Sequence, residues 1–239
     1  MPRPSQSRVS SSQSLSNSQL QTSQSADSSD DITAHVNAVV KAILNLSCNK
    51  AIIKRADLVN IALKGNGRIL GRVLQDANIE LKDIYGYTLV EVEKNKTMIL
   101  CSTLPAGSMD ELNDAYRRRY TLLYLILGYI FMKNGSVPET IVWEFLETIG
   151  IEEQQEHNYF GEVKKMYDSF FKQAYLARTK QALEGLNDEV TLISWGVRSK
   201  HEVSKKEILE GFCKVMNRNP VDFKTQYIEA NGKDDEVDD

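Results

Sequence analysis

The feature of this sequence that most constrains its fold is a change of hydrophobic period that occurs twice, in the same order. In residues 31–104, three stretches with helical spacing precede two stretches in which apolar and polar residues alternate, and the same order returns in residues 116–195. Apolar residues spaced by three and four indicate one face of a helix, whereas alternation indicates a strand. Three helices followed by a hairpin is the order of the winged helix. The sequence therefore predicts a mainly α fold with small β-hairpins (α+β), built from tandem winged helices with a C-terminal helical extension.

The first copy shows the pattern clearly. Its opening helix carries one apolar stripe, made of Val36, Val39, Val40, Ile43 and Leu44. A second helix is expected over residues 54–64 and a third around 69–77. Alternating residues then predict two strands over 87–93 and 97–103, which form a hairpin.

The second copy repeats these elements with little residue identity. A helix is expected over residues 116–133, and Ser136-Val-Pro-Glu139 has the pattern of a capping box that opens the next helix. The third helical stripe runs over 163–171. Two strands around a longer wing are expected over 175–180 and 190–195.

These patterns divide the chain into six segments. Residues 1–30 contain twelve serines and five glutamines, and a segment so poor in apolar residues cannot offset its chain entropy. The predicted segments are a disordered Ser/Gln-rich tail (1–30), winged helix A (31–104), a linker (105–115), winged helix B (116–195), C-terminal helices (196–230) and an acidic tail (231–239).

Four Ser-Gln dipeptides mark the first segment. They begin at Ser5, Ser12, Ser18 and Ser23, and Ser-Gln is the dipeptide that DNA-damage checkpoint kinases favour. Phosphorylation there would add negative charge to a flexible arm. The alternative is chance, because twelve serines and five glutamines in thirty residues give about two such pairs in random order.

Charge and cysteine content limit the class of protein. The net charge of −4 resides in the last nine residues, while residues 31–230 hold 26 basic and 26 acidic residues. A histone-like polycation is excluded, and nucleic-acid binding requires a local patch. Cys48, Cys101 and Cys213 are far apart, so neither a disulfide framework nor a zinc site is expected, and the chain should occupy a reducing compartment.

Membrane segments and catalytic motifs are not expected either. Residues 1–30 lack the apolar core of a signal peptide, and the apolar stretch 120–132 is shorter than the roughly 20 residues that span a bilayer. That stretch predicts a buried core helix. The chain has no H-E-x-x-H, G-x-S-x-G or P-loop motif, and Gly65-Asn-Gly67 is a turn between helices. We therefore expect no enzyme, no cofactor and no metal.

Four blocks in this chain resemble the melanoma-antigen (MAGE) homology domain, over about residues 31–230. They are Lys54-Arg55-Ala56-Asp57-Leu58, Ile84-Tyr-Gly-Tyr-Thr-Leu-Val-Glu-Val92, Leu125-Ile-Leu-Gly-Tyr-Ile-Phe-Met-Lys133 and Ser194-Trp-Gly-Val-Arg198. The resemblance implies two winged helices and an adaptor that binds RING-type ubiquitin ligases. One branch of the family is a subunit of the structural-maintenance-of-chromosomes five/six complex, where it sits with a RING subunit and a kleisin. The short tails of this chain are similar to that branch.

The resemblance also implies a RING-binding position. Family members need a dileucine on the first helix for this contact, and the matching residues here are Ile43 and Leu44. The alternative is that both residues simply pack in the core, since both lie on the apolar stripe.

A second expected site is a DNA-binding face on winged helix B. Winged helices often place the third helix and the wing against DNA. The candidates are Lys164, Lys165, Lys172, Arg178 and Lys180. Phosphate contacts of this kind give salt-dependent binding without sequence preference. The alternative is an ordinary solvated face, because residues 116–195 hold nine basic and eleven acidic residues.

The prediction is thus a non-catalytic, nuclear adaptor subunit that binds a RING subunit and a kleisin and supports DNA repair. Its further expected partners are the complex's ATPases, reached through the complex, and double-stranded DNA, with no membrane. The alternatives are a free-standing MAGE adaptor that stimulates a RING ligase outside chromatin, in the cytoplasm as well, and a winged-helix transcription regulator that reads specific DNA.

Overall fold

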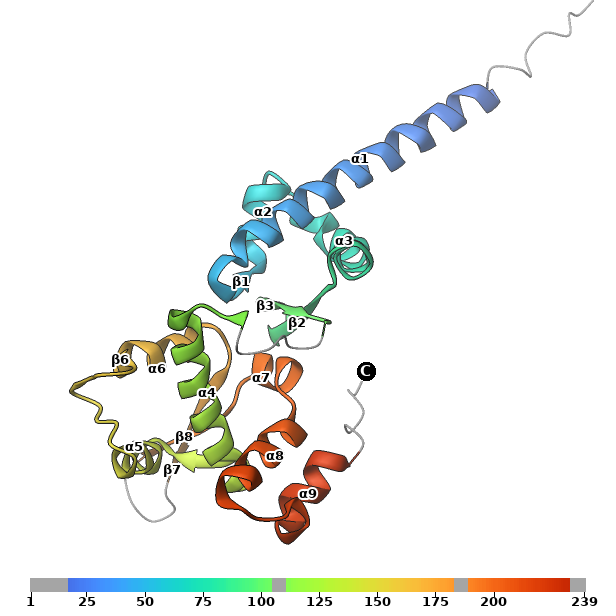
Figure 1. Cartoon of the computed structure of the whole chain (residues 1–239). Helices are drawn as coiled ribbons and strands as arrows, with labels where there is room; N and C mark the ends of the chain where they lie inside the picture. Colours follow the sequence, from blue (N-terminus) through green and yellow to red (C-terminus); the bar gives the residue numbers. More distant parts are fainter. Residues whose placement is uncertain (1–16, 105–110, 183–188, 233–239) are drawn as a thin grey trace, which may run out of the picture.

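The computed structural model describes residues 17–104, 111–182 and 189–232. It contains two helical units, each closed by a three-stranded antiparallel sheet, and a group of helices at the C-terminal end (Figure 1). The predicted fold class, a mainly α protein of two winged helices, is confirmed.

The first unit, here called domain A, contains three α-helices and one sheet. Its elements are α1 (Asn17–Leu46), η1 (Cys48–Lys50), β1 (Ile53–Lys54), α2 (Arg55–Ala62), η2 (Gly67–Ile69), α3 (Leu70–Tyr85), β2 (Tyr87–Glu93) and β3 (Thr97–Ser102). The sheet order is β1-β3-β2. The apolar stripe of α1 packs with α2 and α3 around a core that includes Val39, Leu58 and Ala77.

Helix α1 begins earlier than the sequence patterns predict. It starts at Asn17, fourteen residues before the boundary expected at Asp31, so the prediction of a disordered tail differs from the structure over residues 17–30. Adding residues to an existing helix costs much less than nucleating one, so a packed helix can extend beyond its packed part. Figure 1 shows the start of α1 projecting away from the body of domain A. Residues 1–16 lie outside the described residues.

The second unit, domain B, repeats the order and adds a short hairpin. Its elements are α4 (Asp114–Met132), β4 (Ser136–Pro138), α5 (Glu139–Thr148), β5 (Glu156–His157), β6 (Gly161–Glu162), α6 (Val163–Lys172), β7 (Leu176–Ala182) and β8 (Glu189–Trp195). The main sheet has the order β4-β8-β7. Helix α4 is the predicted core helix, since Leu122, Ile126 and Ile130 are fully buried in it.

The predicted capping box at Ser136 is wrong. Residues 136–138 form strand β4, in which Val137 pairs with Ile193 of β8 and is buried. The N-cap of α5 is Pro138, and no side chain caps it. The edge of β8 offers these residues ladder hydrogen bonds and burial of Val137, which a local cap cannot supply. Strand β1 occupies the equivalent place in domain A, and both short strands were missing from the prediction.

The C-terminal extension packs on domain B. It contains α7 (Val197–Glu202), α8 (Lys205–Met216), η4 (Pro220–Asp222) and α9 (Lys224–Asn231). Ile208, Leu209 and Cys213 of α8 belong to the apolar core of domain B. The expected linker (105–115) is only partly described, because residues 105–110 are outside the description and α4 begins at Asp114. Most of the acidic tail, residues 233–239, is also outside it.

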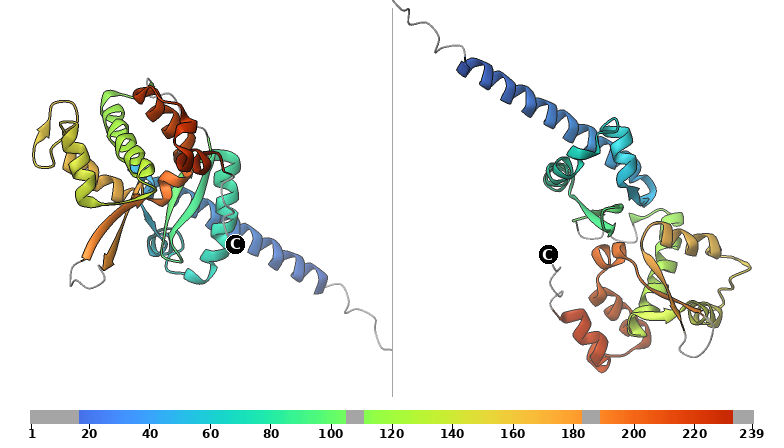
Figure 2. Two further views of the ribbon diagram at one scale, coloured as in Figure 1. Left: turned by 90° about the horizontal axis from the view of Figure 1, so that it is seen from below. Right: turned by 180° about the vertical axis from the view of Figure 1, so that it is seen from behind.

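The two domains meet where β3 of domain A faces α7 (Figure 2). A small apolar cluster joins them, with Ile99 and Cys101 from β3 and Ala174 from the turn before β7. All three cysteines of the chain are free. No helix within the described residues is long and apolar enough to cross a membrane.

Candidate functional site

The two residues proposed to contact a RING partner differ in accessibility. Ile43 is fully buried in the core of domain A, whereas Leu44 is half-buried at the edge of that core. The two residues are neighbours on α1, and consecutive side chains of a helix point in different directions, so Ile43 faces the core while Leu44 lies at the edge of the apolar stripe. Leu44 is therefore the member of the pair that a partner can touch without opening domain A.

The candidate DNA-binding cations of α6 are engaged by neighbouring side chains. The ammonium of Lys164 lies 2.6 Å from Glu153 Oε1 and 5.1 Å from the centre of the Trp143 ring. Lys165 pairs with Glu162, one turn earlier. Each of these two lysines is therefore already paired with a carboxylate of domain B.

The wing of domain B shows the same pairing. Arg178 Nη2 lies 2.7 Å from Glu139 Oε1 and 3.4 Å from Asp168 Oδ1. Lys180 Nζ lies 2.8 Å from Glu189 Oε2, and this hydrogen bond raises the pKa of Lys180. The guanidinium of Arg178 also stacks over Phe171, at 3.8 Å from the ring centre. Lys172 is exposed and, within the described residues, is the only one of the five candidates without an ion pair.

Domain A presents cations that the sequence reading did not single out. Lys64, Arg68 and Arg72 are exposed at the turn before α3 and on its first turn. In the described part of the chain none of them has an ion pair or a hydrogen bond to its side chain. The sequence contains a signal for this surface, because Arg72 falls on the predicted third helix of winged helix A, and the third helix of a winged helix often lies against DNA. The DNA-binding candidates predicted from the sequence all lie on winged helix B.

The phosphorylation candidates are only partly covered by the structure. Ser18 and Ser23 fall within α1. Ser5 and Ser12 lie outside the described residues.

A buried polar network lies between the domains and centres on Arg198 of α7, which is 1% exposed. Arg198 Nη1 donates to Leu100 O at 2.7 Å, and Nη2 donates to Lys50 O at 3.1 Å, both in domain A. Its Nε donates to Gln173 O at 2.8 Å in domain B, and Nη1 also lies 2.9 Å from Glu202 Oε1. One side chain thus holds backbone carbonyls of both domains.

Glu202 connects this arginine to Lys50 of η1. Its Oε2 accepts hydrogen bonds from Lys50 Nζ at 2.7 Å and from the Tyr175 hydroxyl at 2.8 Å. Burial acts to raise the pKa of Glu202, but the charge and hydrogen bond of Lys50, the Tyr175 hydrogen bond and Arg198 together lower it below its usual value. Burial raises the pKa of Tyr175, and it raises that of the nearby Cys101 thiol to about 11. Glu202 is therefore ionised and Tyr175 and Cys101 are neutral at pH 7.

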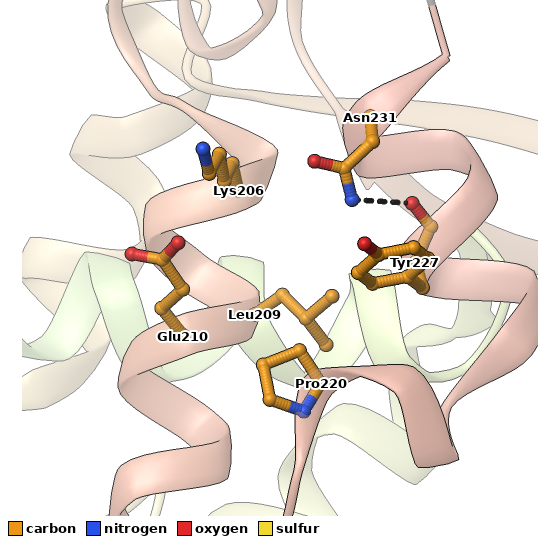
Figure 3. Close-up of a pocket in the computed structure, with 6 residues that line it drawn as sticks. All are labelled: Lys206, Leu209, Glu210, Pro220, Tyr227 and Asn231. Carbon is orange, nitrogen blue, oxygen red and sulfur yellow. Dashed lines mark hydrogen bonds between the residues drawn. The ribbon is translucent and has the colours of Figure 1, made fainter.

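A hollow of about 180 Å³ lies on the C-terminal extension (Figure 3). It is lined by Lys206, Leu209, Glu210, Pro220, Tyr227 and Asn231. Asn231 Nδ2 donates to Tyr227 O at 2.8 Å, which closes one side. The lysine and the acid of the lining, Lys206 and Glu210, lie one turn apart on the same side, on α8, and face Tyr227 and Asn231 across Leu209 and Pro220; the lining contains no cysteine or histidine. Across the described residues, no three His, Cys, Asp or Glu side chains are grouped to hold a metal.

Comparison with known proteins gives one consistent result. The family model of the MAGE homology domain matches residues 39–206. The chain is 32% identical to human melanoma-associated antigen D2 over 204 residues, which cover 83% of this chain and 33% of that protein. It is 34% identical to the human non-structural maintenance of chromosomes element 3 homolog over 200 residues, which cover 82% of this chain and 65% of that protein.

A solved structure agrees with these sequences. A chain in the Nse1-Nse3-Nse4 complex superposes with a TM-score of 0.72 at 31% identity, covering 84% of this chain and 98% of that one. This chain spans about a third of the length of antigen D2 and about two thirds of the element 3 homolog. Because the family model covers most of the two winged helices described above, the chain belongs to the family of proteins with a MAGE homology domain.

Proposed function

We propose that this chain is a non-catalytic adaptor subunit of a structural-maintenance-of-chromosomes five/six complex, in which it binds a RING-type ubiquitin ligase subunit and a kleisin. The observation that carries the proposal is the likeness to a chain of the Nse1-Nse3-Nse4 complex over 98% of that chain's length. The identity to the human element 3 homolog supports the same assignment. Such a subunit acts in the nucleus and supports DNA repair by positioning the ligase.

The surface is suited to an adaptor. Large apolar side chains are exposed on both domains and on the C-terminal extension, among them Ile61, Ile79, Ile84, Leu104, Ile149 and Ile228. Protein partners characteristically bury exposed apolar side chains of this kind.

For the RING contact, the geometry favours Leu44 over Ile43. Leu44 is half-buried beside the end of α1, whereas Ile43 has no exposed surface. A partner that packs on α1 would complete the burial of Leu44, and Ile43 would support it from the core.

For the DNA contact, charge favours domain A over the predicted face of domain B. Residues 31–104 contain ten basic and seven acidic residues, a net charge of +3, whereas residues 116–195 have a net charge of −2. Arg72 lies on the first turn of α3, the third helix of its winged helix and the position that commonly faces DNA, and Arg68 lies in η2 just before it. Among the described residues neither arginine has an ion pair. Of the five domain B candidates, Lys172 is the one without an ion pair among the described residues, so its ammonium is available to a phosphate.

A binding experiment with purified subunits tests this function. The RING and kleisin subunits of the same organism are titrated into the full chain by calorimetry, with Leu44→Ala and a matched control, Val215→Ala on α8, whose side chain is 85% exposed. We expect a stable three-subunit complex, weakened for the RING subunit by Leu44→Ala alone. Absence of binding by the unaltered chain would reject the proposal, and equal losses from both variants would reject the Leu44 contact.

A second candidate function is a free-standing ligase adaptor, favoured by the 32% identity to antigen D2. Affinity purification from nuclear extract separates the two. Recovery of a kleisin and the two ATPases supports the chromosome complex, whereas recovery of an unrelated RING ligase without them supports the free-standing adaptor. Selective capture of one DNA sequence by the isolated chain would instead indicate a transcription regulator.

A further inference from the structure

The polar network between the domains takes no part in the partner contacts proposed above. We propose that Arg198, Glu202 and Lys50 form an interdomain latch that sets the angle between the two winged helices. The latch is a conformational device of the chain itself, and it can be tested without any partner.

The geometry of Arg198 requires one placement of the two domains. A guanidinium is planar and presents its donors in a rigid fork, so it satisfies several acceptors only when they stand in fixed positions. Here two of the acceptors, Leu100 O and Lys50 O, belong to domain A. The other two, Gln173 O and Glu202 Oε1, belong to domain B and its extension. Rotation of one domain against the other would leave buried N–H groups unpaired, which is costly.

The latch also has an exposed end. Lys50 Nζ reaches from domain A to Glu202 and Tyr175, with 40% of the Lys50 side chain exposed. Glu202 is 12% exposed and therefore depends on its two cations for compensation. The latch can thus be opened from the solvent side at Lys50 without disturbing Arg198 directly.

The backbone is strained at the same place. Asn49, Lys50 and Ala174 have φ values of 60°, 58° and 59°, in the left-handed region that L-residues other than glycine seldom adopt. The backbone carbonyl oxygen of each of these three residues accepts a hydrogen bond at the junction between the domains. Gln173 Nε2 donates to Asn49 O at 2.6 Å, Arg198 donates to Lys50 O, and the Arg198 amide donates to Ala174 O.

The close packing beside Arg198 also favours one arrangement of the two domains. A Cβ on Gly196 would lie 2.2 Å from Ala174 O, so only glycine allows α7 to approach this turn. In the described part of the chain, the apolar cluster between the domains has three buried members, Ile99, Cys101 and Ala174, with Ile52, Val90, Val92 and Val197 partly buried against them. Apolar contact has no preferred direction, whereas the hydrogen bonds of a guanidinium require acceptors in fixed positions. The network, rather than apolar burial, is thus the feature that specifies one orientation.

The test measures the distance between the domains in the full chain. Spin labels are placed at Gln75→Cys on α3 and Glu147→Cys on α5, both exposed, in a Cys48→Ser background where the remaining cysteines are buried. Pulsed electron resonance then gives the distance distribution. With the latch intact we expect one narrow distribution. Lys50→Met and Arg198→Lys should broaden it at least twofold.

The controls keep the result decisive. Lys200→Met removes an exposed lysine from the same helix as Arg198 and should leave the distribution narrow. Circular dichroism verifies folding, and Glu202→Gln replaces either variant that unfolds. Unchanged widths in the latch variants, or equal broadening in Lys200→Met, would overturn the proposal. Because no partner is present, these outcomes are independent of the adaptor function.

Discussion

Domains A and B share one topology but present different surfaces on the element that winged helices commonly place against DNA. In domain A, Arg68 lies just before α3 and Arg72 lies on its first turn. Both are exposed and, within the described residues, have no ion pair. In domain B, Lys164 on α6 and Arg178 on β7 each face carboxylates, and Arg178 faces two. The comparison teaches that a shared fold locates a candidate surface, whereas the neighbouring side chains decide whether its charge is available.

The first and largest expected effect separates core from rim in domain A. Ile43→Ala should lower the free energy of unfolding by about 2–5 kcal/mol, because it leaves a cavity in a core where Ile43 is fully buried. The Leu44 side chain is half-buried, so Leu44→Ala should lower the free energy of unfolding by less and leave the fold intact. Urea unfolding followed by circular dichroism measures both. Equal costs for the two variants would show that Leu44 is also a core residue.

The second prediction concerns the stability that Glu202 contributes at the junction between the domains. Glu202→Gln should lower the free energy of unfolding by about 1–3 kcal/mol at pH 7, because it removes a charge that two cations and a hydroxyl share. The folded protein lowers the pKa of Glu202 below its usual value of 4.5. The stabilisation is therefore present above that value and is lost as the pH falls through the lower, folded pKa.

The pH profile checks this assignment. Stability of the unaltered chain should fall more steeply below pH 4.5 than that of Glu202→Gln, since only the former loses this carboxylate. Parallel acid profiles for the two proteins would show that Glu202 does not link folding to protonation.

The third prediction tests the difference between the third helices. The double variant Arg68→Glu, Arg72→Glu should weaken binding to a random duplex and reduce the slope of log affinity against log salt by roughly two phosphate contacts. Lys164→Glu, Lys165→Glu should have a smaller effect, because these lysines already pair with Glu153 and Glu162. Fluorescence anisotropy over a salt series measures both. A larger loss from the domain B pair would reverse the comparison and restore the face predicted from the sequence.

The smallest expected effect concerns the wing of domain B. Lys180→Met breaks the pair between two exposed side chains of the β7–β8 hairpin, Lys180 and Glu189, where water and salt screen the charges. We expect no measurable change in Tm. A clear drop in Tm would mean that the ion pair between Lys180 and Glu189 is shielded from water in solution.

The successful sequence predictions rest on local repetition. The stripe of α3, whose buried members include Val73 and Ala77, and the alternation of β2 and β3 are periodic over several residues, so one chain segment contains the whole signal. Strands β1 and β4 are two and three residues long, too short to show a period. For Ser136-Val-Pro-Glu139 the local motif favoured a cap, and pairing with a strand more than fifty residues away outweighed it.

The order of the elements and, through four residue blocks, the family follow from the amino-acid sequence alone. The tertiary structure alone decided which charges are free and how the two domains are joined. Arg178 meets Glu139 across 39 residues, and Arg198 meets Lys50 across 148. Hydrophobic period is a property of neighbours along the chain, but an ion pair or a buried hydrogen bond depends on distances in space that only the packed chain sets.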